Sequence, residues 1–470
     1  MKTKIGVLVG ILGIAFIFSG CSLVKQEQPG YKLTLEVWGP FDDTRVMEQL
    51  ISRYKSANPF VEDIKYRKVS YTTYKQDLIN ALASGKGPDI FFISNNWVPS
   101  FADKIAPAPG AILGEQEFRN TFVDTVLTDF LIDQKVLGAP LSVDSLGLYY
   151  NKDLFNAAGI TTAPTNWDEF RSDVAKMTSI DATGNITQAG AALGTAFNVN
   201  RSTDILSLLM LQKNTRMSDR KGGSVWFAGP YDVSGASTHP GEEALKFYTE
   251  FADSRSPYYT WNPQMHYSID SFVEGKTGMM FNYSFRVDEI KKKNPKLNFA
   301  VARVPQFSSD KPVDYPNYYG LVVAANKFYD TGDPDGVKKT ATSVSDNDLR
   351  LHEAWELVRY LTLPANGKVT LSNRLSGNAK DFPMDVDPAE EYLKSTGRPA
   401  ARRDLIEKQK SDPFLGPFAL ENLIAKNWYQ PDQESVETIL AEMIDAVNKG
   451  NATASAALSS AASRIGKLMK

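Results

Sequence analysis

The chain has 470 residues, of which 42% are hydrophobic and 23% are charged, and its formal net charge is −3. This slightly acidic, ordinary composition argues against nucleic acid or an anionic lipid surface as the partner. The length predicts two or three domain-sized units. Cys21 is the only cysteine, so the chain cannot form an internal disulfide.

The first segment has the pattern of an export signal. Two lysines precede an apolar run over residues 5–18, which is short for a membrane span. The motif Phe-Ser-Gly-Cys then ends at Cys21 and resembles the lipobox of bacterial lipoproteins, which implies cleavage before that cysteine and its lipidation. We expect a signal peptide over 1–20 and a lipidated tether over 21–32. An ordinary signal peptide followed by a chance cysteine is the alternative.

Strand and helix patterns alternate in the first part of the chain after the tether. Apolar residues alternate with polar ones over 33–38, which predicts a strand, and recur at helical spacing over 46–54. A second strand is predicted over 64–69, and a second helix over 74–83 ends at a Gly-rich stop. The apolar run 89–93 is typical of a strand in a parallel sheet buried on both faces. This alternation predicts an α/β architecture.

The same alternation continues after residue 141. Further elements are predicted as strands over 146–150, 279–281 and 321–325, and as helices over 154–158 and 452–469. Thr165 is predicted to cap the helix that begins near Trp167. Residues 181–185 predict a hairpin turn rather than a calcium loop, because the later glutamate of an EF-hand is missing.

The sequence lacks the common signatures of catalysis. Its three histidines, His239, His266 and His352, do not stand at metal-ligand spacing. No nucleophile elbow and no phosphate-binding loop occurs. A pair of carboxylates, as in a glycosidase, is the enzyme alternative that the sequence leaves open. We therefore predict that the protein is not an enzyme and that it uses no metal and no cofactor.

Five segments carry the strongest motifs: Gly-Pro-Asp-Ile-Phe at 87–91, Leu-Tyr-Tyr-Asn-Lys-Asp-Leu-Phe at 148–155, Pro-Thr-Asn-Trp-Asp-Glu-Phe at 164–170, Phe-Val-Glu-Gly-Lys-Thr-Gly-Met-Met at 272–280 and Ala-Trp-Glu-Leu-Val-Arg-Tyr-Leu at 354–361. In order and spacing they resemble the extracellular solute-binding proteins of the carbohydrate-binding class, the group that includes maltose-binding protein. Gly278 stands where that family more often has alanine. The resemblance covers nearly the whole chain after the signal peptide.

This resemblance implies the two-lobed periplasmic-binding-protein fold, in which a hinge of three crossing strands joins two α/β lobes around a ligand cleft. The N-terminal lobe is expected to comprise 33–141 plus 320–363, and the C-terminal lobe 145–312 plus 375–470. The crossings are then expected near 140–145, 312–319 and 363–375.

The ligand is expected beyond the carboxyl ends of the strands, where open α/β sheets bind their ligands. A sugar packs its C–H face on an aromatic ring and pairs its hydroxyls with amide and carboxylate groups. The expected ligand-binding residues are therefore Trp38, Asp43, Asn95, Asn96, Trp97, Asp144, Asn200, Arg201, Asn282, Tyr283, Tyr318 and Tyr319. Trp167 and Trp355 lie at apolar helical positions and are expected in the core.

The resemblance also implies a function. We expect an exported, monomeric receptor, lipid-anchored to the cell membrane on its extracytoplasmic side, that binds a sugar or oligosaccharide and delivers it to the permease subunits of an ABC importer. Contact with the membrane is expected through the lipid anchor only. The alternatives are the same fold with a polyamine or a phosphorylated polyol as ligand, and an adhesin or sensor without a transport role.

Overall fold

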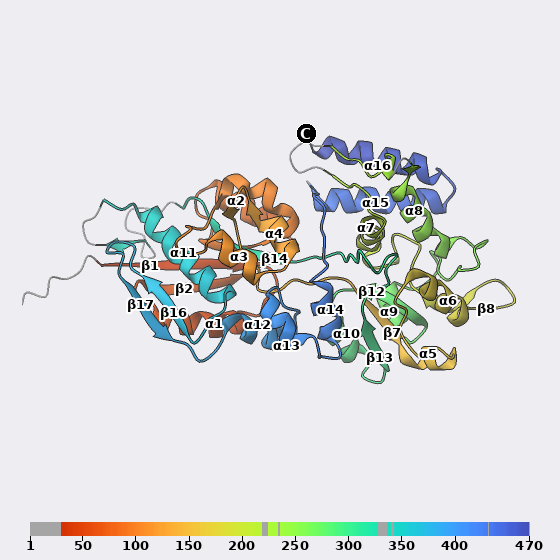
Figure 1. The fold of residues 1–470 in the computed structure, drawn as a ribbon, viewed down its shortest axis with the longest axis horizontal. Helices are drawn as coiled ribbons and strands as arrows, with labels where there is room; N and C mark the ends of the chain where they lie inside the picture. Colours follow the sequence, from red (N-terminus) through yellow and green to blue (C-terminus); the bar gives the residue numbers. More distant parts are fainter. Residues whose placement is uncertain are drawn as a thin grey trace, which may run out of the picture.

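The computed structural model describes residues 30–218, 224–233, 236–327, 336–339, 343–430 and 432–469. These residues form two lobes side by side, with the N-terminal strands in one and the C-terminal helices in the other (Figure 1). The predicted signal peptide 1–20, Cys21 and the tether up to residue 29 lie outside the described residues.

The N-terminal lobe is assembled from two stretches of the chain. The first stretch contributes β1 (Tyr31–Gly39), α1 (Thr44–Ala57), β2 (Val61–Lys68), α2 (Tyr74–Ala83), β3 (Ile90–Ser94), the 3₁₀ segment η1 (Asn95–Lys104), β4 (Ile105–Ala106), α3 (Glu115–Thr121), α4 (Asp124–Phe130), β5 (Leu131–Ile132) and β6 (Lys135–Val136). The second contributes β14 (Tyr319–Ala324), β15 (Lys338–Lys339), α11 (Asp346–Thr362), β16 (Lys368–Ser372), β17 (Ala379–Pro383), α12 (Pro388–Thr396) and α13 (Arg403–Gln409).

A six-stranded mixed sheet organises this lobe, with the order β15-β1-β3-β14-β4 and with β2 paired to β1. β1 pairs in parallel with β2 and β3. β14 runs antiparallel to β3, so the sheet that includes the buried 89–93 run is only partly parallel. The carboxyl ends of β1, β2 and β3 lie at the same edge, together with the start of β14. That edge therefore collects the loops that form one side of the site.

The C-terminal lobe also draws on two stretches. The first contributes β7 (Gly147–Asn151), α5 (Lys152–Ala157), α6 (Trp167–Met177), β8 (Ser179–Ile180), β9 (Ile186–Ala191), α7 (Ser202–Gln212), β10 (Tyr231–Val233), β11 (Ala236–Thr238), α8 (Pro240–Thr249), η2 (Glu250–Ala252), α9 (Ser268–Val273), β12 (Thr277–Asn282), α10 (Arg286–Lys293) and β13 (Phe299–Ala302). The second contributes α15 (Gln433–Asn448) and α16 (Ala454–Leu468). The sheet order is β13-β7-β12-β9-β8.

Local sequence explains the elements that lead to the site. β1 ends at Gly39, where an added Cβ would clash with the Tyr66 hydroxyl. α1 begins after Asp43, whose carboxylate accepts a hydrogen bond from the Arg45 amide at 2.9 Å. The helix predicted over 74–83 coincides with α2. The strand and helix predictions for the first part of the chain are thus confirmed.

The cap of α6 differs by one residue from the prediction. Asn166, not Thr165, is the N-cap, and its side chain accepts from the Glu169 amide at 2.9 Å. The amide and hydroxyl of Thr165 instead donate to the Glu169 carboxylate at 2.7 and 2.9 Å. The reciprocal arrangement resembles a capping box shifted by one position, and it fixes where Trp167 enters the core.

Two separate hydrophobic cores confirm that Trp167 and Trp355 are core residues, one in each lobe. The first two crossings lie where they were expected, because the cores change over between Val143 and Leu146 and between Tyr315 and Tyr318.

The third crossing lies later than expected. Val369, Tyr392 and Ile406 all belong to the N-terminal core, whereas Phe418 and Trp428 belong to the C-terminal core. Residues 375–406, expected in the C-terminal lobe, therefore pack in the N-terminal lobe. The physical reason is α12, whose apolar face packs against α1. The short helix α14 (Leu415–Glu421) lies where the chain changes lobe.

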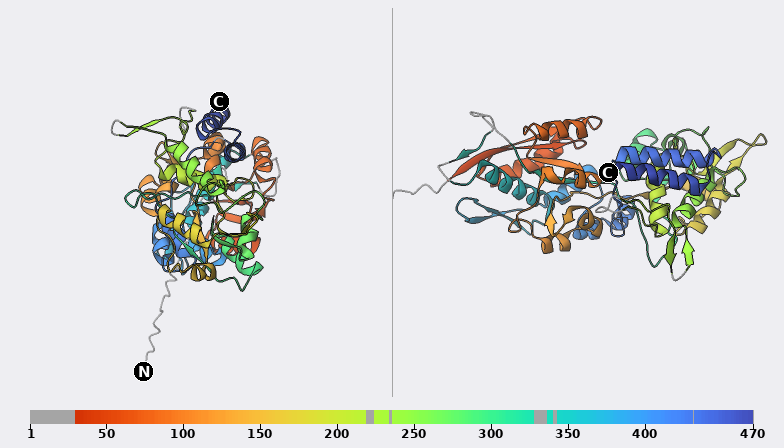
Figure 2. Two further views of the ribbon diagram at one scale, coloured as in Figure 1. Left: turned by 90° about the vertical axis from the view of Figure 1, so that its right-hand side faces the viewer. Right: turned by 90° about the horizontal axis from the view of Figure 1, so that it is seen from above.

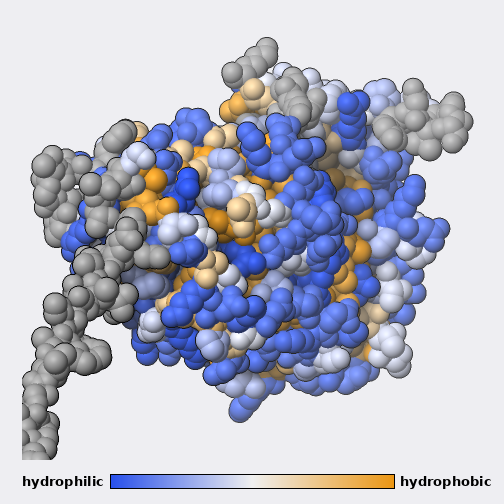
Figure 3. Space-filling model, turned by 60° about the vertical axis from the view of Figure 1, so that its left-hand side comes forward, coloured by the Kyte–Doolittle hydropathy of each residue, from blue (hydrophilic) through white to orange (hydrophobic). Residues whose placement is uncertain are grey.

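The last two helices of the chain pack in the C-terminal lobe. α15 and α16 pack against each other and over α7 and α8 at the outer edge of the C-terminal lobe (Figures 1 and 2). On the face seen in Figure 3, hydrophobic side chains reach the surface in scattered patches between hydrophilic ones. Within the described ranges, no helix is long and apolar enough to cross a membrane.

Candidate functional site

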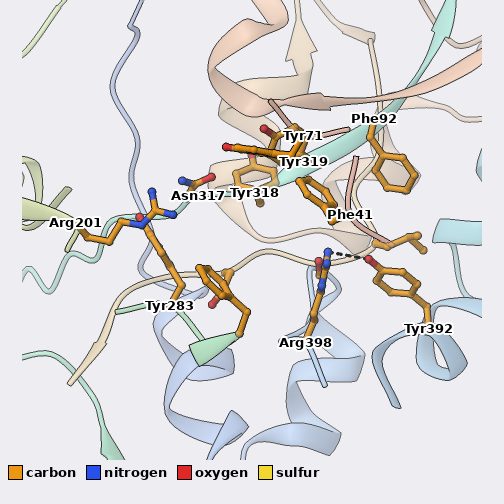
Figure 4. Close-up of a pocket in the computed structure, with 14 residues that line it drawn as sticks. Phe41, Tyr71, Phe92, Arg201, Tyr283, Asn317, Tyr318, Tyr319, Tyr392 and Arg398 are labelled. Atoms are coloured by element: carbon orange, nitrogen blue, oxygen red, sulfur yellow. Dashed lines mark hydrogen bonds between the residues drawn. The ribbon is translucent and has the colours of Figure 1, made fainter. Parts of the chain in front are cut away.

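A cavity of about 350 Å³ lies between the lobes. It is lined by Phe41, Tyr71, Phe92, Leu141, Ser142, Asp144, Arg201, Tyr283, Phe285, Asn317, Tyr318, Tyr319, Tyr392 and Arg398 (Figure 4). Both lobes and two of the crossings contribute. The volume is within the usual range for a small-molecule site.

The N-terminal wall is aromatic because three loops meet at the sheet edge. Phe41 follows β1, Tyr71 follows β2, and Tyr319 begins β14. The ring of Phe41 meets Tyr319 edge-on at 4.6 Å between centroids and lies 6.1 Å from Tyr71. Tyr71 is 64% exposed. The hydroxyl of the neighbouring Tyr318 donates to Asp129 at 2.8 Å, so this wall combines a ring held by a buried hydrogen bond with one exposed ring.

The C-terminal wall centres on Tyr283, which directly follows β12. Its ring is 1% exposed and its hydroxyl donates to Asp204 Oδ2 at 2.8 Å. Phe285 stacks on it at 6.3 Å with an interplanar angle of 18° and is itself 46% exposed. Arg201 also lies over this ring, with Cζ 5.3 Å from the centroid of Tyr283. The wall therefore presents an aromatic stack together with a cation.

Arg201 has an unusual backbone for a residue with a side chain. Its φ is +63°, in the left-handed region that few residues other than glycine adopt. Such conformations persist where the surroundings impose them, and they cluster at binding sites. Here the conformation places Arg201 immediately before α7, so that its side chain reaches the cavity (Figure 4).

Asp144 lies on the first crossing and lines the cavity. The amide and hydroxyl of Ser284 donate to its carboxylate at 3.1 and 2.8 Å, and the Asn317 amide donates to its main-chain oxygen at 2.8 Å. Burial raises the pKa of Asp144 to about 7, although Ser284 and the nearby Arg398 and Arg201 oppose this shift. Asp144 thus joins the first crossing to the C-terminal lobe through Ser284 and to the second crossing through Asn317, and burial places its pKa near neutral.

Arg398 and Tyr392 complete the cavity and were not predicted. Arg398 Nη1 donates to the Tyr392 hydroxyl at 3.0 Å, and Nη2 lies 3.1 Å from Asp42 Oδ1 (Figure 4). The predicted lobe boundary at residue 375 placed both residues in the C-terminal lobe, so they were not assigned to this wall of the cavity. Phe41 and Tyr71 were also missed, although the carboxyl-end rule points to their loops.

Five of the predicted ligand-binding residues line the cavity: Asp144, Arg201, Tyr283, Tyr318 and Tyr319. Trp97 lies behind this wall, with its ring edge-on to Tyr319 at 5.8 Å. Asn282 is fully buried, and its amide donates to Asn200 at 2.8 Å. Asn200 lines a second hollow of about 300 Å³ on the far side of Arg201.

The remaining four predicted residues also lie outside the lining of this cavity. The Trp38 indole donates to Glu36 at 2.7 Å, and Arg67 covers its ring at 4.7 Å. Asp43 caps α1. Asn95 donates to Asp129 at 3.0 Å, and Asn96 accepts from Asn427 at 2.7 Å. Each of these side chains is engaged in holding a strand end or a loop in place.

In chemical terms the cavity offers ring faces, hydroxyl groups, two guanidinium groups and one carboxyl group. Ring faces suit the C–H surface of a polar ring compound, and the polar groups suit its hydroxyls. Among the described residues, no cluster of three or more His, Cys, Asp or Glu side chains is arranged to hold a metal ion. The arrangement therefore favours binding of a small polar molecule.

Comparison with known proteins agrees with this geometry. Residues 39–368 match the family model described as bacterial extracellular solute-binding protein. A putative binding protein of Brucella abortus is 25% identical over 352 residues, which are 74% of this chain and 78% of that protein. The multiple sugar-binding protein of Streptococcus mutans is 22% identical over 363 residues, or 76% of this chain and 78% of that protein.

Solved structures give the same fold. The sugar-binding protein MalE of Xanthomonas citri is similar with a TM-score of 0.69 at 18% identity, over 93% of this chain and 97% of that one. The cyclic α-maltosyl-1,6-maltose binding protein of Arthrobacter globiformis is similar with a TM-score of 0.67 at 20% identity, over 93% and 99%. These similarities confirm the predicted two-lobed α/β fold.

Proposed function

The chain belongs to the family of bacterial extracellular solute-binding proteins, and we propose that it is the receptor of an ABC importer that binds a saccharide between its lobes. In this proposal the bound saccharide holds the lobes together, and the permease subunits recognise the closed receptor. The protein performs no chemistry on its ligand. The receptor acts as a monomer, tethered outside the cytoplasm through a lipid on Cys21.

The aromatic lining of the inter-lobe cavity is the observation that carries the proposal. Tyr319 and Phe41 face it from one lobe, and Tyr283 and Phe285 face it from the other. A flat sugar ring between two such walls would bury both of its faces, and burying an aromatic side chain contributes a large part of the energy of a site. The relatives and structural neighbours whose names mention sugars support the same choice.

A polyamine fits this cavity poorly. Arg201 and Arg398 line it, against the single carboxyl group of Asp144, and a polyamine would bring several more positive charges between them. A phosphorylated polyol meets no such repulsion and remains the second choice of ligand. An adhesin or sensor role would use the same fold without a permease.

The test is a thermal-shift screen of the purified protein against neutral and acidic saccharides, polyols, polyol phosphates and polyamines, followed by calorimetric titration of each hit. A ligand that binds only the folded protein raises the melting temperature, and the stabilisation grows with the logarithm of the ratio of ligand concentration to Kd. The proposal expects hits among the saccharides only. Stabilisation by a polyamine and by no saccharide would contradict it.

The choice between transport and sensing needs a second measurement. Deletion of the gene should abolish uptake of the radiolabelled saccharide identified in the screen. Normal uptake in the deletion strain would contradict the transport role, and it would leave the binding result unchanged.

A further inference from the structure

Two arginines reach the same cavity from opposite lobes. Arg201 comes from the loop before α7 in the C-terminal lobe, and Arg398 follows α12 in the N-terminal lobe (Figure 4). A neutral sugar needs hydrogen-bond partners but does not need two guanidinium groups. Guanidinium groups match carboxylate and phosphate oxygens, to which they donate two parallel hydrogen bonds.

Arg201 is incompletely paired within the protein. Its side chain is only 26% exposed, and its Nε is buried without a hydrogen-bond partner among the described residues. Asp204 lies 3.8 Å from Nη1, which is long for an ion pair, and the same Asp204 oxygen already accepts from Tyr283 at 2.8 Å. A buried guanidinium with unused donors costs free energy unless a ligand supplies acceptors.

Two acidic groups near the cavity already accept hydrogen bonds within the protein. Asp42 accepts from the Tyr392 hydroxyl at 3.0 Å and lies 3.1 Å from Arg398 Nη2. Asp144 accepts from the amide and hydroxyl of Ser284. Asp144 is the one carboxyl group among the described residues that line the cavity, against the two guanidinium groups of Arg201 and Arg398. The lining therefore holds more cationic than anionic groups.

From this arrangement we propose that the solute is an acidic saccharide, whose carboxylate or phosphate group binds to Arg201 and Arg398 while its ring packs against the aromatic walls. This inference rests on the proposed function and narrows it. Arg201 binds the anionic group, and the Tyr283 ring supports its guanidinium, with Cζ 5.3 Å from the ring centroid. Arg398, fixed by Tyr392 at 3.0 Å, approaches from the other lobe, so an anion between the two would also favour closure.

The experiment compares matched acidic and neutral sugars on the purified protein. The pairs are glucuronate and glucose, galacturonate and galactose, and their 1,4-linked disaccharides, with glucose 6-phosphate as the phosphate arm. Thermal shift and calorimetric titration are measured at low and high salt. The acidic member of at least one pair should bind about 10- to 100-fold more tightly than the neutral one, as charge-assisted hydrogen bonds do. Only its affinity should fall with added salt.

The variant arm uses Arg201→Gln, with Arg255→Gln as the matched control. Arg255 is also paired with an aspartate, at 2.9 Å, but its side chain is 88% exposed on the surface and does not line the cavity. Arg201→Gln should abolish the preference for the acidic sugar, and Arg201→Lys should restore part of it. Arg255→Gln should bind like the parent. Whether uronates or glucose 6-phosphate bind more tightly identifies the anionic group.

The possible failures are distinguishable. A neutral sugar that binds as tightly as its acidic partner overturns this inference and leaves the saccharide receptor in place. An unchanged acidic preference in Arg201→Gln also overturns it, because another group would then read the charge. Binding of a non-saccharide, with no saccharide bound, overturns both proposals.

Discussion

The side chains of Asp314 and Glu421 are both buried and lie on adjoining segments that connect the lobes. Each carboxyl group has one oxygen without a hydrogen-bond partner among the described residues. The other oxygens are satisfied: the Tyr315 amide donates to Asp314 at 2.7 Å, and Arg303 and the Val304 amide donate to Glu421 at 3.1 Å. Burial raises the pKa of Glu421 to about 7, against the opposing effect of Arg303. Burial and the negative charge of Glu421 raise the pKa of Asp314.

These shifts predict that stability falls as the pH rises from about 5 to about 8. The folded protein keeps a proton on Glu421 that the unfolded chain releases near its ordinary pKa of 4.5. The stabilisation is therefore complete below that value and is lost as the pH rises through about 7. In Glu421→Gln, the fall in the free energy of unfolding between pH 5 and 8 should be smaller than in the parent by about 2–3 kcal/mol. Urea unfolding at pH 5, 6, 7 and 8 measures it.

The control for this experiment is Glu62→Gln, since the side chain of Glu62 is 45% exposed and pairs with Lys338 at the surface. Its unfolding free energy should follow the parent at every pH. Parent and Glu421→Gln curves that run parallel from pH 5 to 8 would contradict the assignment. The buried Glu353, whose pKa burial raises to about 8, contributes to the fall in both proteins and cancels in the difference.

The exposed rings of the cavity should matter for binding and little for stability. Phe285→Ala and Tyr71→Ala remove side chains that are 46% and 64% exposed. Each should weaken binding of the saccharide identified in the screen by about 2 kcal/mol, as loss of an aromatic anchor does. Each should change the free energy of unfolding by less than about 1 kcal/mol. Calorimetric titration and urea unfolding give the two numbers.

Buried tryptophans provide the opposite comparison. Trp167→Ala and Trp355→Ala remove fully buried rings from the two cores and should cost about 3–5 kcal/mol of stability. Trp38→Ala should behave like these variants, because its ring is 5% exposed and lies under Arg67. If Trp38→Ala lost affinity at unchanged stability, the cavity described here would be incomplete.

Closure of the lobes around the ligand should be visible in solution. The first two crossings are joined by the hydrogen bond from the Asn317 amide to Asp144, and the Lys426 amide donates to Asp314 at 2.8 Å. A ligand that contacts both lobes favours the closed state by its differential affinity. Small-angle scattering at saturating saccharide should give a smaller radius of gyration than the free protein. Equal radii would argue against closure.

The anchor has its own test. Cys21 follows an apolar segment and a small-residue motif, so Cys21→Ser should prevent acylation and leave the protein uncleaved or free of the lipid. Metabolic labelling with radioactive palmitate, followed by detergent partitioning, measures this. Acyl label that persists in the variant would show that another residue carries the lipid. The replacement Ser22→Ala, one residue later, is the control and should keep the label.

Much of the fold could be predicted from the sequence because its signals are local. The 74–83 helix follows from apolar spacing and a glycine stop, and the family itself was identified from motifs now matched over 39–368. The third crossing could not be placed, because it depends on α12 packing on α1 across more than 300 residues. No local pattern distinguishes the surface helix of one lobe from that of the other.

The candidate site was harder to predict for a related reason. Trp38 and Phe41 both stand near the end of β1, but side chains alternate between the faces of a strand. The sequence does not say that Trp38 points to Glu36 and that Phe41 faces the cavity. Arg398 could not be assigned to the cavity, because the third crossing was predicted too early in the chain. Tyr283 and Arg201 could be named because Tyr283 directly follows a strand and Arg201 directly precedes a helix. Asp144 could be named because it lies at the expected first crossing.

The late third crossing has a consequence for the order in which the protein matures. The hydroxyl of Tyr392 must reach the carboxylate of Asp42, 350 residues earlier, before the N-terminal core is complete. Pairings between such distant residues slow folding, and domains normally fold as units while the chain emerges. Neither lobe of this protein can complete its folding until most of the chain has been made. Such late completion suits the proposed export, because a chain that is still unfolded can be threaded across a membrane and can form its binding cavity afterwards.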